Sequence, residues 1–177
     1  MSSGKEKIAF KEAYAVVGEL ILLATALDHQ CNHVLIQVLN LGGAPLLEPV
    51  VATLDPVRKI EILKERAKHI GHVAWKTPLI KYLEKVEKIN AQRNIACHRP
   101  LIPDGDDAVF GSVAAAKLLK NLYKDRPSAA DLKKTIALGE VALGEGINLI
   151  ENFERFNKEY ELRNSTSHKP TTPESLR

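Results

Sequence analysis

The sequence is poor in cysteine and in aromatic residues, and its charges of opposite sign nearly balance. Two cysteines in 177 residues provide neither a disulfide framework nor a zinc knuckle, which excludes small folds held together by such links. Aromatic residues make up 5% of the chain, so we expect an aliphatic core of Leu, Ile, Val and Ala. The net charge of +3 is too small to indicate nucleic-acid binding through bulk electrostatics.

Long apolar runs are also missing. The run LILLATAL at residues 20–27 ends at Asp28, far short of the ~20 residues that cross a bilayer. The first ten residues lack the apolar stretch and the cleavage site of a secretory signal. We therefore expect a soluble, cytoplasmic protein with reduced thiols and no membrane partner. Phosphate-binding glycine loops, dinucleotide fingerprints and serine elbows are absent too, which disfavours the enzyme classes that need them.

The sequence does contain strong helical periodicity. Apolar residues recur every three or four positions over residues 7–41, which predicts a long first helix that Gly42 and Gly43 end. The opposite side of this helix also carries apolar residues, among them Leu22 and Ile36. Because helices with two apolar sides often pack on both, we interpret this second side as a candidate homodimer surface.

Capping residues mark two further helices. The dipeptide Asp-Pro at 55–56 is typical of a helix start, and the helix that follows ends at Gly71. A third helix is predicted to begin after Thr77, to run over residues 79–98 and to stop before Pro100.

Ser128 is the predicted N-cap of a last long helix over residues 129–161. Three glycines, Gly139, Gly144 and Gly146, lie inside it. Each costs up to ~1 kcal/mol relative to alanine in a helix. Either another helix passes close to these positions, or they mark a bend.

The least regular parts of the chain are residues 99–127 and the C-terminal residues 163–177. The composition of 99–107 predicts a loop, and the residues after it allow a short strand or hairpin near 107–110 and a short helix over 113–124. The tail is rich in Ser, Thr and Pro without an apolar pattern, which predicts disorder.

The predicted fold class is therefore all-α, a four- to five-helix up-and-down bundle. It forms one domain over residues 1–162, which is long enough to bury a core without metal or disulfides.

The segment NAQRNIACHRP at residues 90–100 interrupts the apolar pattern of the third helix. With successive residues about 100° apart, Ile89 and the apolar residues before it define a stripe, and Arg93 falls in its middle. Asn94 lies at the edge of the stripe and His98 lies beyond it. An arginine in this position either pairs with a carboxylate of another helix, extends its guanidinium to solvent, or binds an anion.

The anion-binding alternative fits the chemistry of metal-free RNA cleavage. A guanidinium fork binds phosphate with two parallel hydrogen bonds and stabilises the charge that builds on a phosphorane. A histidine titrates near neutral pH, so it can deprotonate the 2′-hydroxyl or protonate the leaving oxygen. Arg93 and His98 supply these two groups.

The string RNIACH at 93–98 resembles the signature of the HEPN superfamily, an arginine and a histidine separated by four to six residues, with a polar residue after the arginine. The order of helices over roughly residues 10–160 resembles the same superfamily. The resemblance implies a bundle of four or five helices, usually a homodimer whose two motifs face each other across a cleft. It implies a metal-independent endoribonuclease of toxin–antitoxin or other defence systems, with Arg93, Asn94 and His98 as catalytic residues and with RNA and an antitoxin as partners.

Other members of the HEPN superfamily are inactive modules for dimerisation, RNA binding or partner binding, and this alternative stays open. The same spacing of arginine and histidine occurs twice more, from Arg66 to His72 and from Arg163 to His168. The first pair spans the predicted end of the second helix, and the second pair begins the predicted tail. Neither stands on a packed helix, so context favours the pair at 93–98.

On an ideal helix, Arg93 and His98 point about 140° apart. Their side chains converge through the length of the arginine, through fraying before Pro100, or across a two-fold axis. The last fits a dimeric cleft, and it predicts that a monomer is inactive.

His29 and His33 are four residues apart, which is metal-ligand spacing, but no Glu-x-x-His partner accompanies them. We interpret them as polar interface residues, with a place in the same cleft as Arg93 left open, and we expect neither a metal nor a cofactor. Cys97 precedes His98, but adjacent helix positions do not face each other. Cys97 is therefore predicted to be a small core residue.

Overall fold

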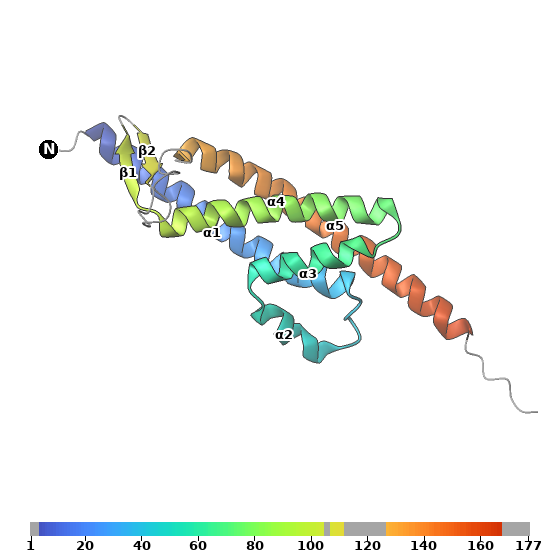
Figure 1. The fold of residues 1–177 in the computed structure, drawn as a ribbon. Helices are drawn as coiled ribbons and strands as arrows, with labels where there is room; N and C mark the ends of the chain where they lie inside the picture. Colours follow the sequence, from blue (N-terminus) through green and yellow to red (C-terminus); the bar gives the residue numbers. More distant parts are fainter. Residues whose placement is uncertain (1–3, 105–106, 112–126, 168–177) are drawn as a thin grey trace, which may run out of the picture.

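The computed structural model describes residues 4–104, 107–111 and 127–167. Its elements in chain order are α1 (Gly4–Val38), the 3-10 turn η1 (Pro45–Leu47), α2 (Glu48–Thr53), α3 (Pro56–Lys68), α4 (Val73–His98), β1 (Leu101–Asp104), β2 (Asp107–Phe110) and α5 (Ala129–Ser167). The fold is an all-α bundle with one small hairpin, as predicted (Figure 1). None of the described helices is long and apolar enough to cross a membrane.

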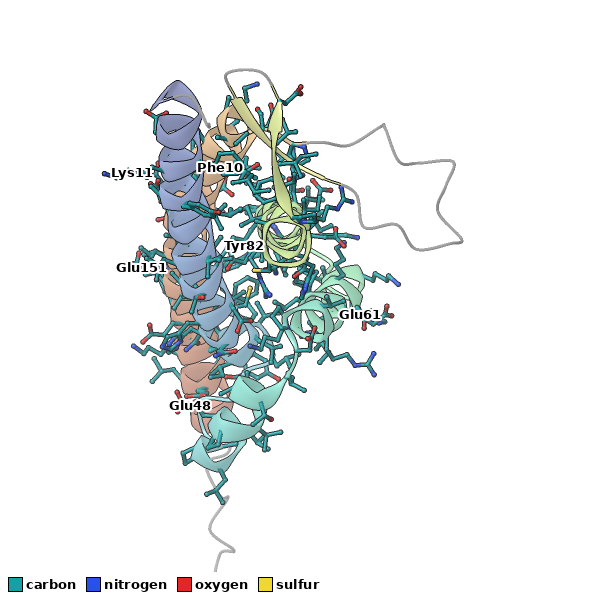
Figure 2. The ribbon with its side chains drawn as sticks, turned by 90° about the vertical axis from the view of Figure 1, so that its left-hand side faces the viewer. Phe10, Lys11, Glu48, Glu61, Tyr82 and Glu151 are labelled. Atoms are coloured by element: carbon teal, nitrogen blue, oxygen red, sulfur yellow. The ribbon has the colours of Figure 1, made fainter. Side chains whose placement is uncertain are left out.

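Three long helices, α1, α4 and α5, form the centre of the bundle, and α3 packs against α1 and α4. Side-chain contacts advance together along α1 and α5, from Gln30 with Leu143 to Gln37 with Asn157, so these two helices are parallel. Figure 1 shows that α4 runs antiparallel to both of them. Seen nearly along α4 in Figure 2, α1 and α5 lie on one side of it and α3 on the other.

The up-and-down order holds for α3, α4 and α5 but not for the first connection. α1 and α3 run in the same direction, because η1 and α2 carry the chain back to the start of α3 (Figure 1). The up-and-down order predicted for the whole bundle is therefore wrong at this connection, since the direction of a connection is not encoded in the periodicity of either helix.

The first helix ends earlier than predicted and by a different residue. Asn40, with φ of 53°, takes the left-handed position after α1. The N–H groups of Leu41 and Asn40 donate to the carbonyls of Ile36 and Gln37, at 2.8 and 3.1 Å. This is a Schellman cap, which Asn tolerates because its short side chain reduces the cost of positive φ. The glycines at 42–43 were the wrong candidates.

The N-cap predicted for α3 is confirmed, and the one predicted for α4 is wrong. The Asp55 carboxylate accepts a hydrogen bond from the N–H of Val57 at 2.8 Å. α4 begins at Val73, where the His72 ring accepts from Ala74 at 3.3 Å. Pro78 consequently lies inside the helix, where its missing N–H leaves one turn without its usual bond.

The predicted loop at 99–107 contains a strand. β1 pairs antiparallel with β2, and the hairpin covers the end of the bundle where Phe110 is buried. The predicted helix over 113–124 lies outside the described residues. Ser128 caps α5 as predicted, because its hydroxyl accepts from the N–H of Asp131 at 3.3 Å while the Asp131 carboxylate accepts from the N–H of Ser128 at 3.2 Å.

α5 continues to Ser167, so residues 163–167 are helical and the disorder predicted for them is wrong. The remainder of the tail, 168–177, lies outside the described residues.

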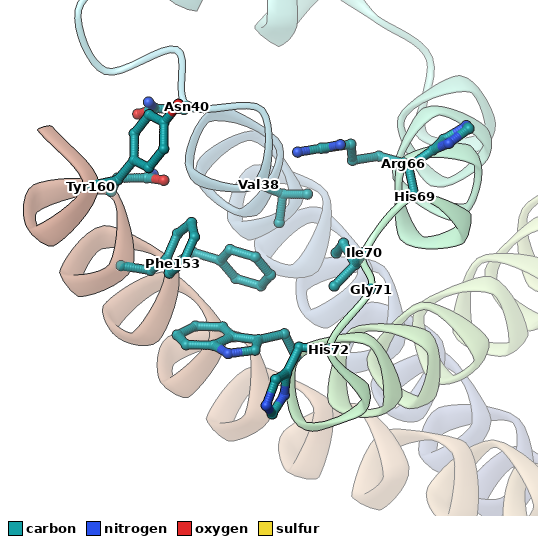
Figure 3. A pocket seen from close by; sticks show the side chains of 12 residues that line it. Val38, Asn40, Arg66, His69, Ile70, Gly71, His72, Phe153 and Tyr160 are labelled. Atoms are coloured by element: carbon teal, nitrogen blue, oxygen red, sulfur yellow. The ribbon is translucent and has the colours of Figure 1, made fainter. Parts of the chain in front are cut away.

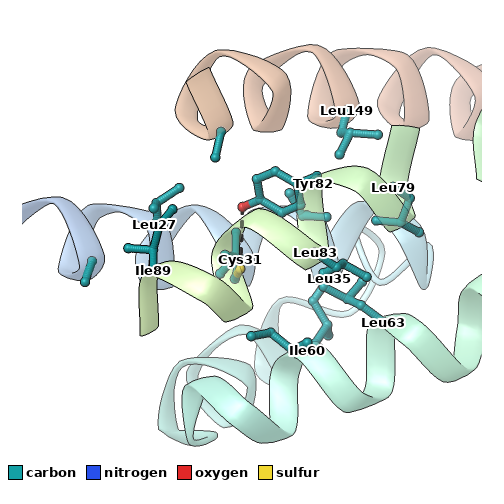
Figure 4. Close-up of a cluster of buried hydrophobic side chains, with 14 of the residues drawn as sticks. Leu27, Cys31, Leu35, Ile60, Leu63, Leu79, Tyr82, Leu83, Ile89 and Leu149 are labelled. Carbon is teal, nitrogen blue, oxygen red and sulfur yellow. Dashed lines mark hydrogen bonds between the residues drawn. The ribbon is translucent and has the colours of Figure 1, made fainter. Parts of the chain in front are cut away.

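The core is aliphatic, as the composition predicted. Its fully buried side chains come from α1, α3, α4 and α5, and they include Leu35, Leu63, Leu83 and Ile89, which Figure 4 shows, and Leu132. Burial along α5 does not follow a single stripe. Ile147 is 54% exposed, whereas Ala142 and Leu149 are buried. The long α5 packs on both α1 and α4, so its buried face follows two partners instead of one stripe.

Two of the three glycines in α5 mark close approaches to α1. A Cβ at Gly139 would lie 2.3 Å from Cδ2 of Leu23, and a Cβ at Gly146 would lie 2.0 Å from Oε1 of Gln30. Gly144 has open space around it. The close passage of another helix was therefore a correct explanation for two positions.

Inside the core, the sequence analysis missed two polar contacts. The Lys59 side chain is completely buried, and its Nζ lies 2.8 Å from Oδ1 of Asp28, which is 31% exposed. The second contact joins Tyr82 of α4 to the residues that follow Asp28 on α1. The Tyr82 hydroxyl donates to Oε1 of Gln30 at 3.2 Å and lies 3.5 Å from Sγ of Cys31 (Figure 4). Burial raises the pKa of the Cys31 thiol to about 11 and raises the pKa of Tyr82 still further above its usual range.

The second side of α1, predicted from Leu22 and Ile36, is open only in part, because Ile36 is half-buried and packs against the core. Tyr14 and Leu22 are 64% and 74% exposed. On α5, Val141 and Ile147 are each 54% exposed. The predicted dimer surface on α1 therefore has apolar side chains available, and dimerisation stays a prediction.

Candidate functional site

The RNIACH segment occupies the last two turns of α4, which ends at His98 as predicted. The N–H of Arg99 closes the helix by donating to the carbonyl of Ile95 at 3.0 Å, and β1 begins two residues later. Pro100 follows directly and cannot continue the helix. The motif therefore stands on a regular helix at its junction with the hairpin.

Arg93 is half-buried, while Asn94 and His98 are exposed. The helical spacing placed Arg93 in the middle of the apolar stripe, but Arg93 is not fully buried in the structure. Ile95 and Ala96, in the same two turns, are half-buried as well, so the cover over α4 thins toward its end. A half-buried arginine can cover apolar neighbours with its methylenes while its guanidinium stays in water.

No carboxylate in the described part of the chain pairs with Arg93. Its side chain forms neither an ion pair nor a hydrogen bond with another described residue. The structural alternative, an arginine held by a carboxylate of a neighbouring helix, therefore has no support within residues 4–104, 107–111 and 127–167.

The sequence analysis misjudged two neighbours of Arg93. Cys97 was predicted to be a core residue and is exposed, for the same reason that Arg93 is only half-buried. Asn90 was not singled out, yet it is 7% exposed. Its angle on the wheel, about 100°, falls between those of the buried Leu79 and Leu83, so the signal was available in the sequence.

Within one subunit the motif does not form a closed site. Arg93 and His98 are five positions apart on a regular helix, which separates them by about 140° around its axis and about 7.5 Å along it. Asn94 is next to Arg93, on the side toward His98. The helix geometry alone therefore does not bring the three side chains to one point, and a site shared with a second copy stays a prediction.

Of the two other matches to the motif, the pair at Arg163 departs from expectation, and the pair at Arg66 spans a helix end as predicted. Arg163 lies inside α5, not in a disordered tail, and its partner His168 lies outside the described residues. Arg66 stands in the last turn of α3, and His72 is the N-cap of α4. Both line one pocket, although a break between two helices separates them in sequence.

This pocket has a volume of about 530 Å³ and lies between the end of α1, the α3–α4 junction and α5 (Figure 3). This pocket was not predicted from the sequence. Trp75 from α4 and Phe153 from α5 meet there at 5.2 Å between ring centroids. A signal existed in the concentration of aromatic residues on the last helix, but their meeting with Trp75 depends on helix packing.

His29 and His33 are exposed on α1, and their rings stack with centroids 5.1 Å apart. Among the described residues, no group of three or more His, Cys, Asp or Glu side chains is placed to hold a metal ion. The two histidines therefore lie on the surface of α1, and their place in a cleft with Arg93 stays a prediction.

Comparison of the chain with protein-family models, with curated proteins and with solved structures finds no match in any of the three. What the protein does must therefore be inferred from the residues of its own sites.

Proposed function

We propose that the protein is a HEPN-like, metal-independent endoribonuclease whose site forms where two subunits meet. The observation that supports this most directly is the state of Arg93. It is half-buried on a regular helix, has no partner among the described residues, and is followed by the exposed Asn94 and His98. A guanidinium in this position is available for an anion such as a phosphodiester.

Each of the three residues has a defined role in the proposed reaction. His98 takes the proton from the 2′-hydroxyl as it attacks the adjacent phosphorus and returns a proton to the 5′-oxygen as that bond breaks. Arg93 stabilises the negative charge on the pentacoordinate phosphorane. Asn94 holds a phosphate oxygen in position. The products are a 2′,3′-cyclic phosphate and a 5′-hydroxyl, and the reaction consumes no water.

The homodimer is part of the proposal, because one subunit points Arg93 and His98 in different directions. A two-fold axis places the Arg93 of one subunit near the His98 of the other. The exposed apolar residues on α1, Leu22 among them, provide surface for such an interface.

The first experiment measures cleavage of a labelled RNA by the purified protein with a metal chelator present. We expect cleavage that leaves a 2′,3′-cyclic phosphate, and a loss of at least about 100-fold in rate for His98→Ala and Arg93→Ala. Arg58→Ala is the control for the loss of an arginine, since Arg58 is an exposed residue paired with Glu61. A variant His98→Ala that cleaves at the wild-type rate would rule out the proposed site.

The second experiment tests whether the site is shared. In a dimer that contains one Arg93→Ala subunit and one His98→Ala subunit, one of the two shared sites keeps both groups. Coexpression of the two inactive variants should therefore restore roughly a quarter of the wild-type activity, since half of the dimers are mixed and each has one intact site. If the mixture stays inactive while the mixed dimers are shown to form, Arg93 and His98 act within one subunit.

The alternative is an inactive helical module for dimerisation, RNA binding or partner binding, and the exposed apolar side chains on α1 and α5 favour it equally. The melting temperature separates the two. A structural Arg93 gives a large drop in melting temperature for Arg93→Ala, whereas a catalytic Arg93 leaves the melting temperature nearly unchanged. A toxin role is tested by expression in cells, where His98→Ala should relieve growth arrest and an antitoxin would be sought as a binding partner.

A further inference from the structure

The 530 Å³ pocket lies at the opposite end of α4 from the RNIACH segment. About twenty residues of helix separate His72 from Arg93, which corresponds to about 30 Å. The pocket is therefore a separate site, and its volume is within the range of small-molecule sites, ~300 to 1,000 Å³.

One wall of the pocket is aromatic. Trp75 contacts Phe153 and Phe156, with ring centroids 5.2 and 5.4 Å away, and Phe156 stacks on Tyr160 at 6.4 Å. These four residues are four of the nine aromatic side chains in the chain, and they include its only tryptophan. In so aromatic-poor a protein, this concentration at one pocket is not what a uniformly aliphatic core produces.

The aromatic wall is also open. Phe156 is 47% exposed and Tyr160 is 54% exposed, although both line the pocket. Exposed aromatic faces at a concave site are costly to hydrate and favour a flat apolar group that covers them.

The facing wall carries a cation. Arg66 extends from α3 across the opening toward the end of α1, where Asn40 and Val38 lie (Figure 3). Its side chain has neither an ion pair nor a hydrogen bond with another described residue, and none of the described residues that line the pocket is acidic. Asn157, also in the lining, is held in place by donating to the Gln37 carbonyl at 2.9 Å.

We propose that this pocket binds a small aromatic carboxylate, with the ring against the wall formed by Trp75, Phe156 and Tyr160 and the carboxylate on Arg66. The guanidinium fork matches the two oxygens of a carboxylate, and its single permanent charge matches a monoanion. This inference does not depend on the ribonuclease proposal, because no residue is shared between the two sites.

The test uses anilinonaphthalene sulfonate, an aromatic monoanion that fluoresces when bound. Trp75 is the only tryptophan and lines the pocket, so excitation of tryptophan should produce strong sensitised emission from a probe bound there and much weaker emission from a probe bound at the far end of α4. Naphthaleneacetate should displace the probe, and its neutral analogue naphthaleneacetamide should displace it at least about tenfold less effectively, since a charge-assisted bidentate contact is lost.

Two variants separate charge from shape. Arg66→Ala should lower the affinity for the probe by about tenfold and abolish the preference for naphthaleneacetate over naphthaleneacetamide. Arg58→Ala, an equal change of charge on the same helix, should leave both unchanged. Phe156→Ala should lower the affinities for naphthaleneacetate and naphthaleneacetamide by the same factor. Both Arg66 and Phe156 have exposed side chains, so circular dichroism should show native folding in each variant.

Three results would overturn the proposal. They are probe emission that Trp75 does not sensitise, equal displacement by the acid and the amide in the wild type, and an Arg66→Ala variant that binds the probe as Arg58→Ala does. A failed ribonuclease assay affects none of these measurements, and a failed binding assay does not affect the roles proposed for Arg93 and His98.

Discussion

The buried ion pair between Lys59 and Asp28 gives an unequal prediction for its two partners. Lys59 Nζ lies 2.8 Å from Oδ1 of Asp28, with the lysine side chain fully buried and the aspartate 31% exposed. Asp28→Ala leaves a charged ammonium in the core without a counter-ion. Lys59→Met fills the same space with an apolar side chain and leaves a carboxylate that water can reach from one side.

The expected costs follow from this difference in exposure. Removing one partner of a buried pair typically costs 3–5 kcal/mol, and the partial exposure of Asp28 places Asp28→Ala near ~3 kcal/mol. Lys59→Met should cost about 1 kcal/mol or less, because the remaining Asp28 recovers much of its hydration. For a domain of this size, a loss of ~3 kcal/mol lowers the melting temperature by roughly 6 to 12 °C.

The double variant Asp28→Ala/Lys59→Met tests the cause of the effect. If the unpaired ammonium is responsible, removing it should restore stability to within about 1 kcal/mol of the wild type, which gives a coupling energy of ~3 kcal/mol. Urea unfolding followed by circular dichroism measures the free energy of unfolding for all four proteins, with equal slopes against urea as the check on two-state behaviour.

The reasoning fails if Asp28→Ala costs no more than Lys59→Met. It fails equally if the double variant is as unstable as Asp28→Ala, because the cost would then come from lost packing at position 28 and not from an unpaired charge at Lys59.

Two further predictions concern the glycines of α5 and the thiols. Gly146→Ala should lose about 1 to 2 kcal/mol of stability, because its Cβ displaces the Gln30 amide from both of its hydrogen bonds. Gly144→Ala has open space around it, so it should gain up to ~1 kcal/mol in the same urea titration. A native thiol titration should find one reactive cysteine, the exposed Cys97, because burial and a pKa of about 11 keep Cys31 protonated at neutral pH; two thiols should react once the chain is unfolded, and two reactive thiols in the native protein would contradict the burial of Cys31.

The N-caps of α3 and α5 could be predicted because a cap depends on neighbours in sequence, whereas the start of α4 was missed because His72, and not Thr77, caps it. The cap at Asp55 needs only the N–H two residues on, and the box of Ser128 with Asp131 spans one turn. The end of α1 was misplaced for a related reason. Asn40 and the glycines after it all tolerate a cap, and local chemistry does not choose between adjacent candidates.

Burial near helix ends was predicted less well. The helical periodicity treats Arg93 and Cys97 as continuations of a stripe that is buried at Ile89, but burial along this stripe decreases toward the end of α4, where Arg93 is half-buried and Cys97 is exposed. A periodic pattern states which side of a helix faces its neighbours, and it does not state how far along the helix those neighbours extend.

The sequence by itself determined the helical segments, the aliphatic core and the position of RNIACH at a helix end before Pro100. Only the tertiary structure decided that Lys59 is buried against Asp28, that Arg93 is half-buried and without a partner among the described residues, and that an arginine and four aromatic side chains surround one pocket. The physical reason is the range of the interactions. Helix caps and periodicity join residues within about four positions, whereas the contacts that bring α1 to α3 and to α5 join residues 31, 113 and 120 positions apart.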